Sequence, residues 1–381
     1  MDPALLTAQI LLLGLGIFGV AQYRPDLVPD HAARVVLGVA ATLVVGRMRA
    51  NKLLALGPFL FVIAGLGLLV ALVIGDGPGG VRRWISLGGL EFQPSELMKL
   101  ALVIYLASFF HRHGRAGPLA GPVAIIGLTV ALVLAEPDLG TAVHIAILAL
   151  AMLFAAGVGW FRLISIGVAG LALSAALAGP YVQRFGYIQG RLTGFLDYIS
   201  ARADTTGSAY QVSQSLAAVR AGGFIGSPPG TALPHLPAAP TDMILASVAA
   251  GAGLLGALAV VACFVAICWR GLQIADAAIR PDARGQAVSA GPLALMAFGA
   301  TFALALQATL NIGVTVGLLP VTGMPLPLVS YGGTSLLAVS ASLGILHAVN
   351  RYVREAHAPA RPAALDRESG VVRMSGLGSA R

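Results

Sequence analysis

The amino-acid sequence predicts an all-α polytopic membrane protein with about ten transmembrane helices. Hydrophobic residues make up 57% of its 381 residues and charged residues only 10%, whereas a soluble domain carries about a quarter charged residues. The apolar residues gather in runs of roughly twenty, the length that a helix needs to cross the hydrocarbon core. One long polar interruption, residues 183–242, separates the seventh run from the eighth and is predicted to be a large extracytoplasmic loop.

The predicted spans follow one another along the chain, and glycine or proline inside them is tolerated in a membrane helix. They cover residues 4–22, 33–47, 54–75, 94–110, 117–135, 140–159, 162–182, 243–269, 289–316 and 332–350. The second and fourth runs are short for a full crossing, so their ends are the least well defined. Residues 1–354 are predicted to form one transmembrane domain. Residues 355–381 have no periodic apolar pattern and are predicted to be a disordered cytoplasmic tail.

Alternate loops differ in charge, and this difference predicts the orientation of the chain. The basic loops hold Arg47, Arg49, Lys52, Arg112, Arg115, Arg162, Arg270, Arg280 and Arg284, and the tail adds further arginines. The other loops hold Asp26, Asp30, Asp76, Glu91, Glu136, Asp138, Asp197, Asp204 and Asp242. Because positively charged loops stay in the cytoplasm, both termini are expected there and the 183–242 loop outside. The net charge of +8 follows this bias and forms no basic stripe, so nucleic-acid binding is not predicted.

Two further features of the sequence limit the class of protein. The first apolar run follows Met1-Asp2-Pro3 without a basic segment, which favours a first span over a cleaved signal peptide. The only cysteines, Cys263 and Cys268, lie in one apolar run. They are interpreted as small packing residues, and neither a disulfide nor a metal site is indicated.

The leading candidate for a functional residue is Asp242, which ends the long loop directly before an apolar run. A carboxylate at the mouth of a membrane helix costs free energy unless it has a partner or a water-filled cavity. Within the same loop, residues 211–219 have the pattern of a short interfacial helix. The loop also carries basic side chains that could hold an anionic substrate: Arg184, Arg191, Arg202 and Arg220.

A second candidate constellation lies in the outer loop at residues 82–99. Pro94 suits the first position of a helix, and Glu96 in the first turn is favoured by the helix dipole. Glu96 and Lys99 are three residues apart and share a helix face. Two interpretations stay open: a structural ion pair that carries Lys99 into the membrane, or a cation that faces a cavity and binds a phosphate.

Two more segments are expected on the same outer side. In the turn Glu136-Pro137-Asp138, the aspartate could cap the helix that follows. Residues 311–335 are dense in glycine and proline and include Ser330 and Tyr331. Non-helical backbone at membrane depth persists only where it is packed in protein or lines a wet cavity. This segment is therefore expected to close the side that holds Asp242.

Five motifs of the chain together resemble the SEDS family, the polytopic proteins of bacterial shape, elongation, division and sporulation. In chain order they are RRWISLGGLEFQPSELMKL, EPDLGTA, GSAYQVSQS, PTD and LLPVTGMPLPLVSYGGTS, between about Arg82 and about Leu336. The resemblance implies a ten-helix peptidoglycan glycosyltransferase of the bacterial inner membrane. Such an enzyme polymerises lipid II, an undecaprenyl-diphosphate-linked disaccharide-pentapeptide, in cell elongation or division, and works with a class B penicillin-binding protein.

The resemblance also implies roles for particular residues, with Asp242 at the position of the family's essential outer-loop aspartate. Glycosyl transfer from a lipid diphosphate needs a base for the acceptor hydroxyl and positive charge for the departing diphosphate. Asp242 is the expected base. The candidate diphosphate partners are Arg83, Arg191 and Lys99, and further candidate substrate contacts are Glu96, Asp138, Ser330 and Tyr331. A divalent cation could share the task, but the sequence shows no ligand cluster for it.

The chain departs from the family's pattern around Asp242. Ala238 and Pro240 stand where the family usually has Glu and His, and Ala250 and Gly251 stand where it has two glutamates. The loss of nearby negative charge is expected to lower the pKa of Asp242 and weaken it as a base. Two alternatives to a polymerase therefore stay open. One is a non-catalytic SEDS-like scaffold for a class B penicillin-binding protein, and the other is a lipid II transporter or flippase.

Overall fold

The computed structural model describes residues 1–77, 81–87, 90–114, 117–184, 186–200, 207–228, 231–280 and 291–358. The regular secondary structure of this part of the chain is helical apart from one antiparallel hairpin, β1 (Ile85–Leu87) and β2 (Leu90–Phe92). The helices are α1 (Pro3–Tyr23), η1 (Pro25–Leu27), α2 (Val28–Arg47), α3 (Ala50–Ile74), α4 (Pro94–His113), α5 (Ala120–Ala135), α6 (Leu139–Ala155), α7 (Trp160–Arg184), α8 (Gly186–Ile199), α9 (Gly207–Gly222), α10 (Ile244–Ile279), α11 (Gly291–Thr315) and α12 (Gly333–Ala356).

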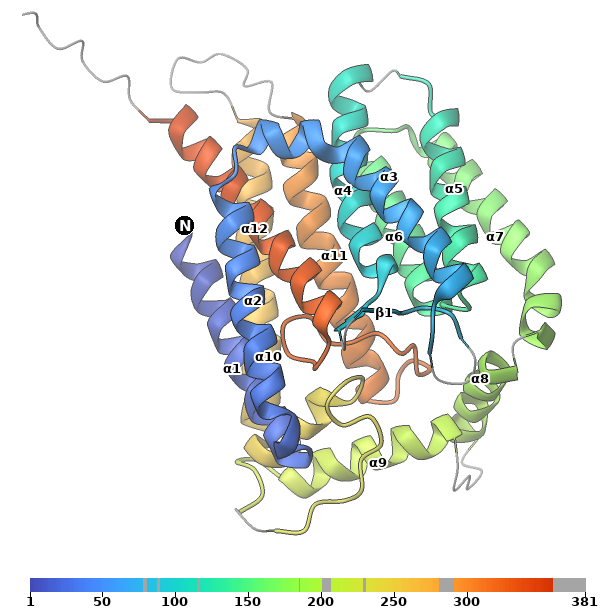
Figure 1. Ribbon diagram of the computed structural model, residues 1–381, viewed down its shortest axis with the longest axis vertical. Helices are drawn as coiled ribbons and strands as arrows, with labels where there is room; N and C mark the ends of the chain where they lie inside the picture. The colour runs from blue at the N-terminus through green and yellow to red at the C-terminus, as the bar shows by residue number, and fades with distance from the viewer. Residues whose placement is uncertain are drawn as a thin grey trace, which may run out of the picture.

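Each predicted span overlaps a helix of the bundle, as far as the described residues reach (Figure 1). Within the described ranges, six helices are long and apolar enough to cross a membrane: α1, α2 with η1, α3, α10, α11 and α12. Shorter apolar helices are α5, α6 and the first part of α7. The two runs with poorly defined ends extend further than the apolar pattern, since α2 begins at Val28 and α4 ends at His113. α12 continues to Ala356, past the predicted start of the tail.

The start of α1 and the start of α10 lie at opposite ends of the helix bundle. At one end, the backbone N–H of Asp2 donates to Nδ1 of His347 at 3.0 Å, and the Asp2 carboxylate pairs with Arg270 at 2.8 Å. The start of α1 therefore lies beside the C-terminal halves of α10 and α12. The start of α10, which Asp242 precedes by two residues, lies at the opposite end, where α8 and α9 run across the bundle (Figure 1).

The 183–242 loop contains two helices, α8 and α9, of which the sequence pattern indicated only one. The predicted interfacial helix at 211–219 is part of the longer α9, and α8 was not predicted. Both helices are held by contacts to other segments. Ser208 Oγ donates to the Arg191 carbonyl at 3.2 Å, and Ser215 Oγ donates to the Thr315 carbonyl at 2.9 Å. These contacts tie α9 both to α8 and to the end of α11.

The loop after α9 packs against a break in α10. Gly253 has a positive φ of 68°, a conformation that glycine adopts without steric cost. The interrupted backbone bonds instead to the loop, because the N–H of Leu254 donates to the Gly223 carbonyl at 2.9 Å. In return, the N–H of Ser227 donates to the Ala250 carbonyl at 3.0 Å. The two backbones approach so closely that a Cβ on Gly222 would overlap the carbonyl oxygen of Ala249.

The substitution Gly222→Ala is expected to lower the free energy of unfolding by about 1–3 kcal/mol, because the added methyl group meets backbone that cannot rotate away. The thermal unfolding midpoint of the purified protein in detergent measures the effect. Gly190→Ala is the matched control, since a Cβ at that position in α8 meets no atom within 4 Å. Equal midpoints for the two variants would show that the joint between the loop and α10 is not tightly packed.

Candidate functional site

The candidate catalytic carboxylate is presented by a turn that the segment between α11 and α12 holds in place. Asn311 Nδ2 donates to the carbonyl oxygen of Asp242 at 2.9 Å. Ser330 Oγ donates to the Thr241 carbonyl at 2.6 Å, and the N–H of Tyr331 donates to the Pro240 carbonyl at 2.8 Å. All three residues of the Pro-Thr-Asp motif are therefore fixed through their backbone carbonyls. These bonds do not use the side chain of Asp242, which is half-buried.

Two guanidinium groups act on the Asp242 carboxyl from different parts of the chain. Burial raises the pKa of Asp242 above its usual value, and the charges of Arg191 on α8 and of Arg83 before β1 oppose this rise. The carboxylate of Asp138 adds to it. The net shift of the pKa is upward from that of an ordinary aspartate, whereas the sequence analysis expected a pKa lower than in a site that keeps the neighbouring acids. The sequence comparison counted the acids that are missing but not the burial of the remaining one.

Arg83 is buried and links the candidate site to the Glu136-Pro137-Asp138 turn. Its Nε donates to the Glu136 carbonyl at 3.0 Å, and its terminal nitrogen donates to the Pro137 carbonyl. The Glu136 side chain is fully buried. Burial, together with the nearby Asp138 charge, raises the pKa of Glu136 to about 9. Glu136 is therefore protonated at neutral pH and adds no negative charge beside Arg83.

Asp138 caps α6, as its position in the sequence predicted. One carboxylate oxygen accepts from the N–H of Thr141 at 3.1 Å, and the other accepts from Gln93 Nε2 at 3.2 Å. Gln93 itself precedes α4 and bonds to Thr334 at the start of α12. Asp138 thus joins the α5–α6 turn to the N-terminal ends of α4 and α12, close enough to Asp242 to influence its pKa.

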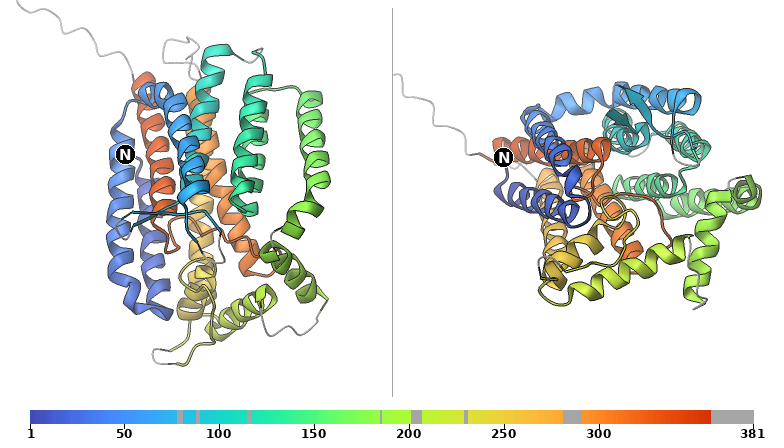
Figure 2. Two further views of the ribbon diagram at one scale, coloured as in Figure 1. Left: turned by 45° about the vertical axis from the view of Figure 1, so that its right-hand side comes forward. Right: turned by 60° about the horizontal axis from the view of Figure 1, so that its bottom comes forward.

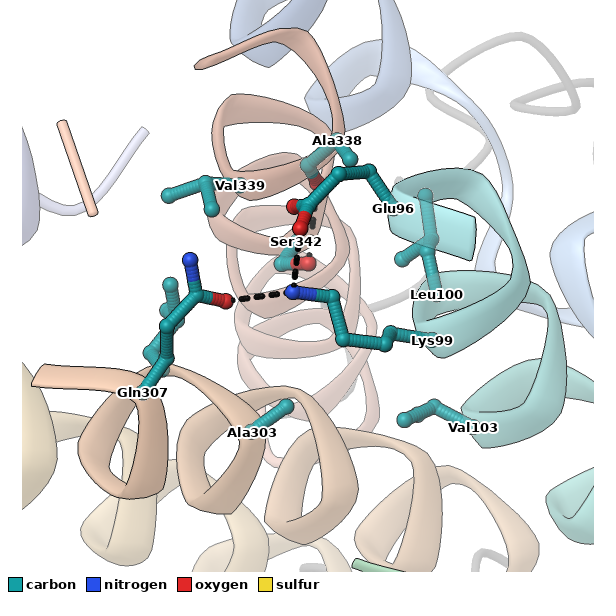
Figure 3. Close-up of a pocket in the computed structure, with 10 residues that line it drawn as sticks. Glu96, Lys99, Leu100, Val103, Ala303, Gln307, Ala338, Val339 and Ser342 are labelled. Carbon is teal, nitrogen blue, oxygen red and sulfur yellow. Dashed lines mark hydrogen bonds and ion pairs between the residues drawn. The ribbon is translucent and has the colours of Figure 1, made fainter. Parts of the chain in front are cut away.

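Lys99 and Glu96 form the buried ion pair that one of the two interpretations predicted. Lys99 Nζ lies 2.7 Å from Glu96 Oε1 and 2.7 Å from Gln307 Oε1 (Figure 3). The three side chains line a small cavity between α4, α11 and α12 of about 20 Å³, room for about one water molecule. The polar contacts observed for Lys99 are thus protein groups deep in the helix bundle.

Ser330 and Tyr331 both make contacts within the protein. Ser330 is buried, and its hydroxyl also accepts from the N–H of Leu326 at 2.7 Å. The Tyr331 hydroxyl donates to Asp30, and the Arg34 guanidinium lies 4.3 Å from the centre of the Tyr331 ring. Tyr331 therefore connects the segment that holds Asp242 to the N-terminal end of α2.

The structure thus brings Arg83, Arg191 and Asp138 to Asp242 and places Lys99 and Glu96 apart from them. Two buried side chains on α11 connect these two groups: Gln307, which the sequence analysis did not select, and Asn311, which begins the 311–335 segment. Among the described residues, no group of three or more His, Cys, Asp or Glu side chains is placed to hold a metal ion. The side chain of Arg184, the residues Arg115, Arg202, Asp204 and Arg284, and the tail at 359–381 lie outside the described part.

These features define a polytopic membrane protein with a carboxylate that senses the charges of two guanidinium groups at one end of its helix bundle. The model of the cell cycle protein family of FtsW, RodA and SpoVE matches residues 26–355. The chain belongs to this family, which is the SEDS family that its motifs resemble.

Named relatives and a solved structure agree with the family. A probable peptidoglycan glycosyltransferase FtsW of Alkalilimnicola ehrlichii is 39% identical over 70% of this chain and 66% of its own length. The FtsW of Nitrosococcus halophilus with the same description is 34% identical over 85% of each chain. A structure on the coordination of polymerization and crosslinking by a peptidoglycan synthase complex contains a chain that is 27% identical, with a TM-score of 0.75 over 92% of this chain and 98% of that one.

Proposed function

We propose that this protein is a peptidoglycan glycosyltransferase of the bacterial inner membrane that polymerises lipid II in cell division or elongation. The observation that carries the proposal is the placement of the Asp242 carboxyl within the fields of Arg83 and Arg191, on a turn with a fixed backbone. The descriptions of the FtsW relatives name the same activity. A carboxylate with a raised pKa is a better proton acceptor than an ordinary exposed aspartate.

In this mechanism, Asp242 takes the proton from the hydroxyl of the acceptor sugar. The acceptor oxygen then forms a bond to the anomeric carbon of the donor sugar, and the bond from that carbon to the diphosphate oxygen breaks. The departing undecaprenyl diphosphate carries the negative charge away from the donor. Arg83 and Arg191 stabilise this charge, since a guanidinium group makes forked contacts with phosphate oxygens.

The apolar tail of a lipid substrate needs access from the bilayer, and α7 is the helix that offers it. Figure 2 shows α7, in green, standing away from the rest of the bundle. Its apolar side chains are exposed on opposite faces of the helix, including Ile164 and Leu173, nine residues apart. One contact near its outer end, from the Tyr181 hydroxyl to the Leu134 carbonyl at 3.0 Å, joins α7 to α5. The inner face of α7 is therefore the proposed path for the polyprenyl chain.

Orientation and partnership complete the proposal. We infer that both termini lie in the cytoplasm and Asp242 outside, with α1 to α7 and α10 to α12 as the ten spans of one domain. The basic residues Arg47 and Arg351 support this orientation, since they lie at the end of the bundle that holds Asp2: Arg351 bonds to the Arg47 carbonyl, and the neighbouring Asn350 bonds to Asp2. The proposed partner is a class B penicillin-binding protein. The related chain that belongs to a peptidoglycan synthase complex supports this partnership.

The proposal is tested with purified protein and lipid II, in the presence of its partner. Wild-type protein is expected to make glycan strands, and Asp242→Ala to make none above background, because the substitution removes the base. Asp26→Ala is the matched control, since Asp26 is an exposed aspartate paired with Arg24 at 2.7 Å. Equal strand formation by wild type and Asp242→Ala would end the assignment of Asp242.

The scaffold alternative rests on the missing acids, and the structure shows what replaces two of them. Ala250 is fully buried, and its carbonyl belongs to the joint with the loop after α9, where Gly251 also packs. These positions are used for packing in this protein. Complementation of a strain that lacks the protein by Asp242→Ala would favour a scaffold, whereas failure to complement with normal membrane levels supports catalysis.

A further inference from the structure

Two buried amide side chains on α11 connect the deep ion pair to the candidate active site. Gln307 and Asn311 are four residues apart, so they lie one above the other on the same face of the helix. Both are almost completely buried, with exposed fractions of 2% and 1%. A buried amide in an apolar helix costs free energy unless it forms hydrogen bonds, so its partners indicate its purpose.

The inner of the two, Gln307, joins the ion pair to the segment that closes the outer side. Its Oε1 accepts from Lys99 Nζ at 2.7 Å, as Figure 3 shows. Its Nε2 donates to the Pro325 carbonyl at 2.9 Å and to Ser335 Oγ at 3.5 Å. The Lys99–Glu96 pair thereby fixes the amide, and the amide fixes the backbone of the segment between α11 and α12.

The outer of the two, Asn311, joins the same segment to the catalytic turn. Its Nδ2 donates to the Met324 carbonyl and to the Asp242 carbonyl, both at 2.9 Å. Met324 and Pro325 are consecutive residues, so the two amides hold adjacent carbonyls of one stretch of backbone. Hydrogen bonds therefore run from Glu96 through Lys99 and Gln307 to Pro325, and from Met324 through Asn311 to the backbone carbonyl of Asp242, with the Met324–Pro325 peptide joining the two parts.

We propose that Gln307 and Asn311 are positioning residues that hold the Asp242 turn on the frame set by the buried Lys99–Glu96 pair. The inference rests on the proposed function for its catalytic consequence, but not for its structural one. It gives the ion pair a role that requires no contact with the diphosphate of the substrate. A displacement of about 1 Å at a reacting group can lower a rate about 100-fold, so such support matters for the reaction.

The structural consequence is tested by hydrogen exchange of the backbone amides of residues 238–243, measured by mass spectrometry on the intact protein. Asn311→Leu and Gln307→Met are expected to raise exchange in this turn at least about tenfold, which corresponds to about 1.4 kcal/mol of lost local stability. Exchange in α6, which neither amide contacts through a hydrogen bond, is expected to stay unchanged. Thr309→Val is the matched control, since Thr309 is exposed on α11 and bonds only to the Ala305 carbonyl within its own helix.

The catalytic consequence is tested by steady-state polymerisation of lipid II. The same variants are expected to lower kcat about tenfold or more and leave KM within about twofold, because neither amide touches the substrate. Gln307→Glu keeps an acceptor for Lys99 and loses the donor to Pro325. It should retain the fold and still lower kcat, which covers the case in which Gln307→Met does not fold.

The results separate this inference from the proposed function. Exchange and kcat equal to wild type in both Asn311→Leu and Gln307→Glu would overturn the positioning role. A rise in KM with unchanged kcat would overturn it too, since that result indicates direct contact with substrate. If wild-type protein makes no glycan, the proposed function fails, and the exchange measurement still decides whether these amides hold the turn.

Discussion

Replacement of Lys99 by methionine is expected to lower the free energy of unfolding by about 3–5 kcal/mol, because it leaves a buried carboxylate without its cation. Glu96 is 2% exposed and lies 2.7 Å from the ammonium group, and its second oxygen has no hydrogen-bond partner in the described part of the chain (Figure 3). The loss would also free one end of Gln307. Thermal unfolding in detergent, followed by tryptophan fluorescence, measures the change.

Two further variants show whether the effect comes from the unpaired charge. Lys52 is the only other lysine of the chain and is exposed at the start of α3, so Lys52→Met is the matched control and should cost little. The double variant Lys99→Met/Glu96→Gln removes both charges and should recover much of the lost stability. An unfolding midpoint for Lys99→Met equal to that of Lys52→Met would mean that the pair contributes nothing to the fold.

The parts of the fold that local sequence signals specify were predicted correctly. Pro94 begins α4 with Glu96 in the first turn, and Asp138 caps α6. Both signals act within one helical turn, so they can be read from neighbouring residues. α8 was missed for the opposite reason. Its residues include three glycines, and its stability comes from contacts with α9, which are distant in sequence.

The residues of the candidate site could be predicted from the sequence, but the hydrogen bonds that hold them in place could not. The motifs pointed to Asp242 and to the basic residues Arg83 and Arg191, which the structure brings together. The direction of the pKa shift was not predictable, since it depends on burial in the folded chain. Gln307 could have been found from the sequence, because it lies four positions before Asn311 in an apolar span. Two polar residues at this spacing lie on the same helix face and are expected to bond to the same neighbouring segment.

Arg83→Met is expected to lower the rate of lipid II polymerisation by about 100-fold or more, because the guanidinium group both fixes the backbone near Asp138 and provides positive charge. The guanidinium holds the carbonyls of Glu136 and Pro137, so its loss releases the turn that precedes Asp138. In the proposed mechanism it also supplies positive charge for the departing diphosphate. Arg82→Met is the matched control, since Arg82 is the adjacent arginine and is exposed, with a bond of 3.0 Å to the Leu72 carbonyl.

The pH dependence of the Arg83→Met variant distinguishes a lost charge from a general loss of structure. The Arg83 charge lowers the pKa of Asp242, against the upward effects of burial and Asp138, while Arg191 acts in the same direction as Arg83. Its removal should raise the pKa of Asp242 further, so that the base is ionised only at higher pH. The acidic limb of the rate profile should therefore move to higher pH, and part of the lost activity should return as the pH rises. Arg83→Lys keeps the charge but cannot donate to two carbonyls at once. The acidic limb of its pH–rate profile should therefore stay at the wild-type pH, while its polymerisation rate is still lower than that of the wild type. An unshifted limb in Arg83→Met would show that Asp242 does not sense this charge, and the assignment of Arg83 to the site would fail.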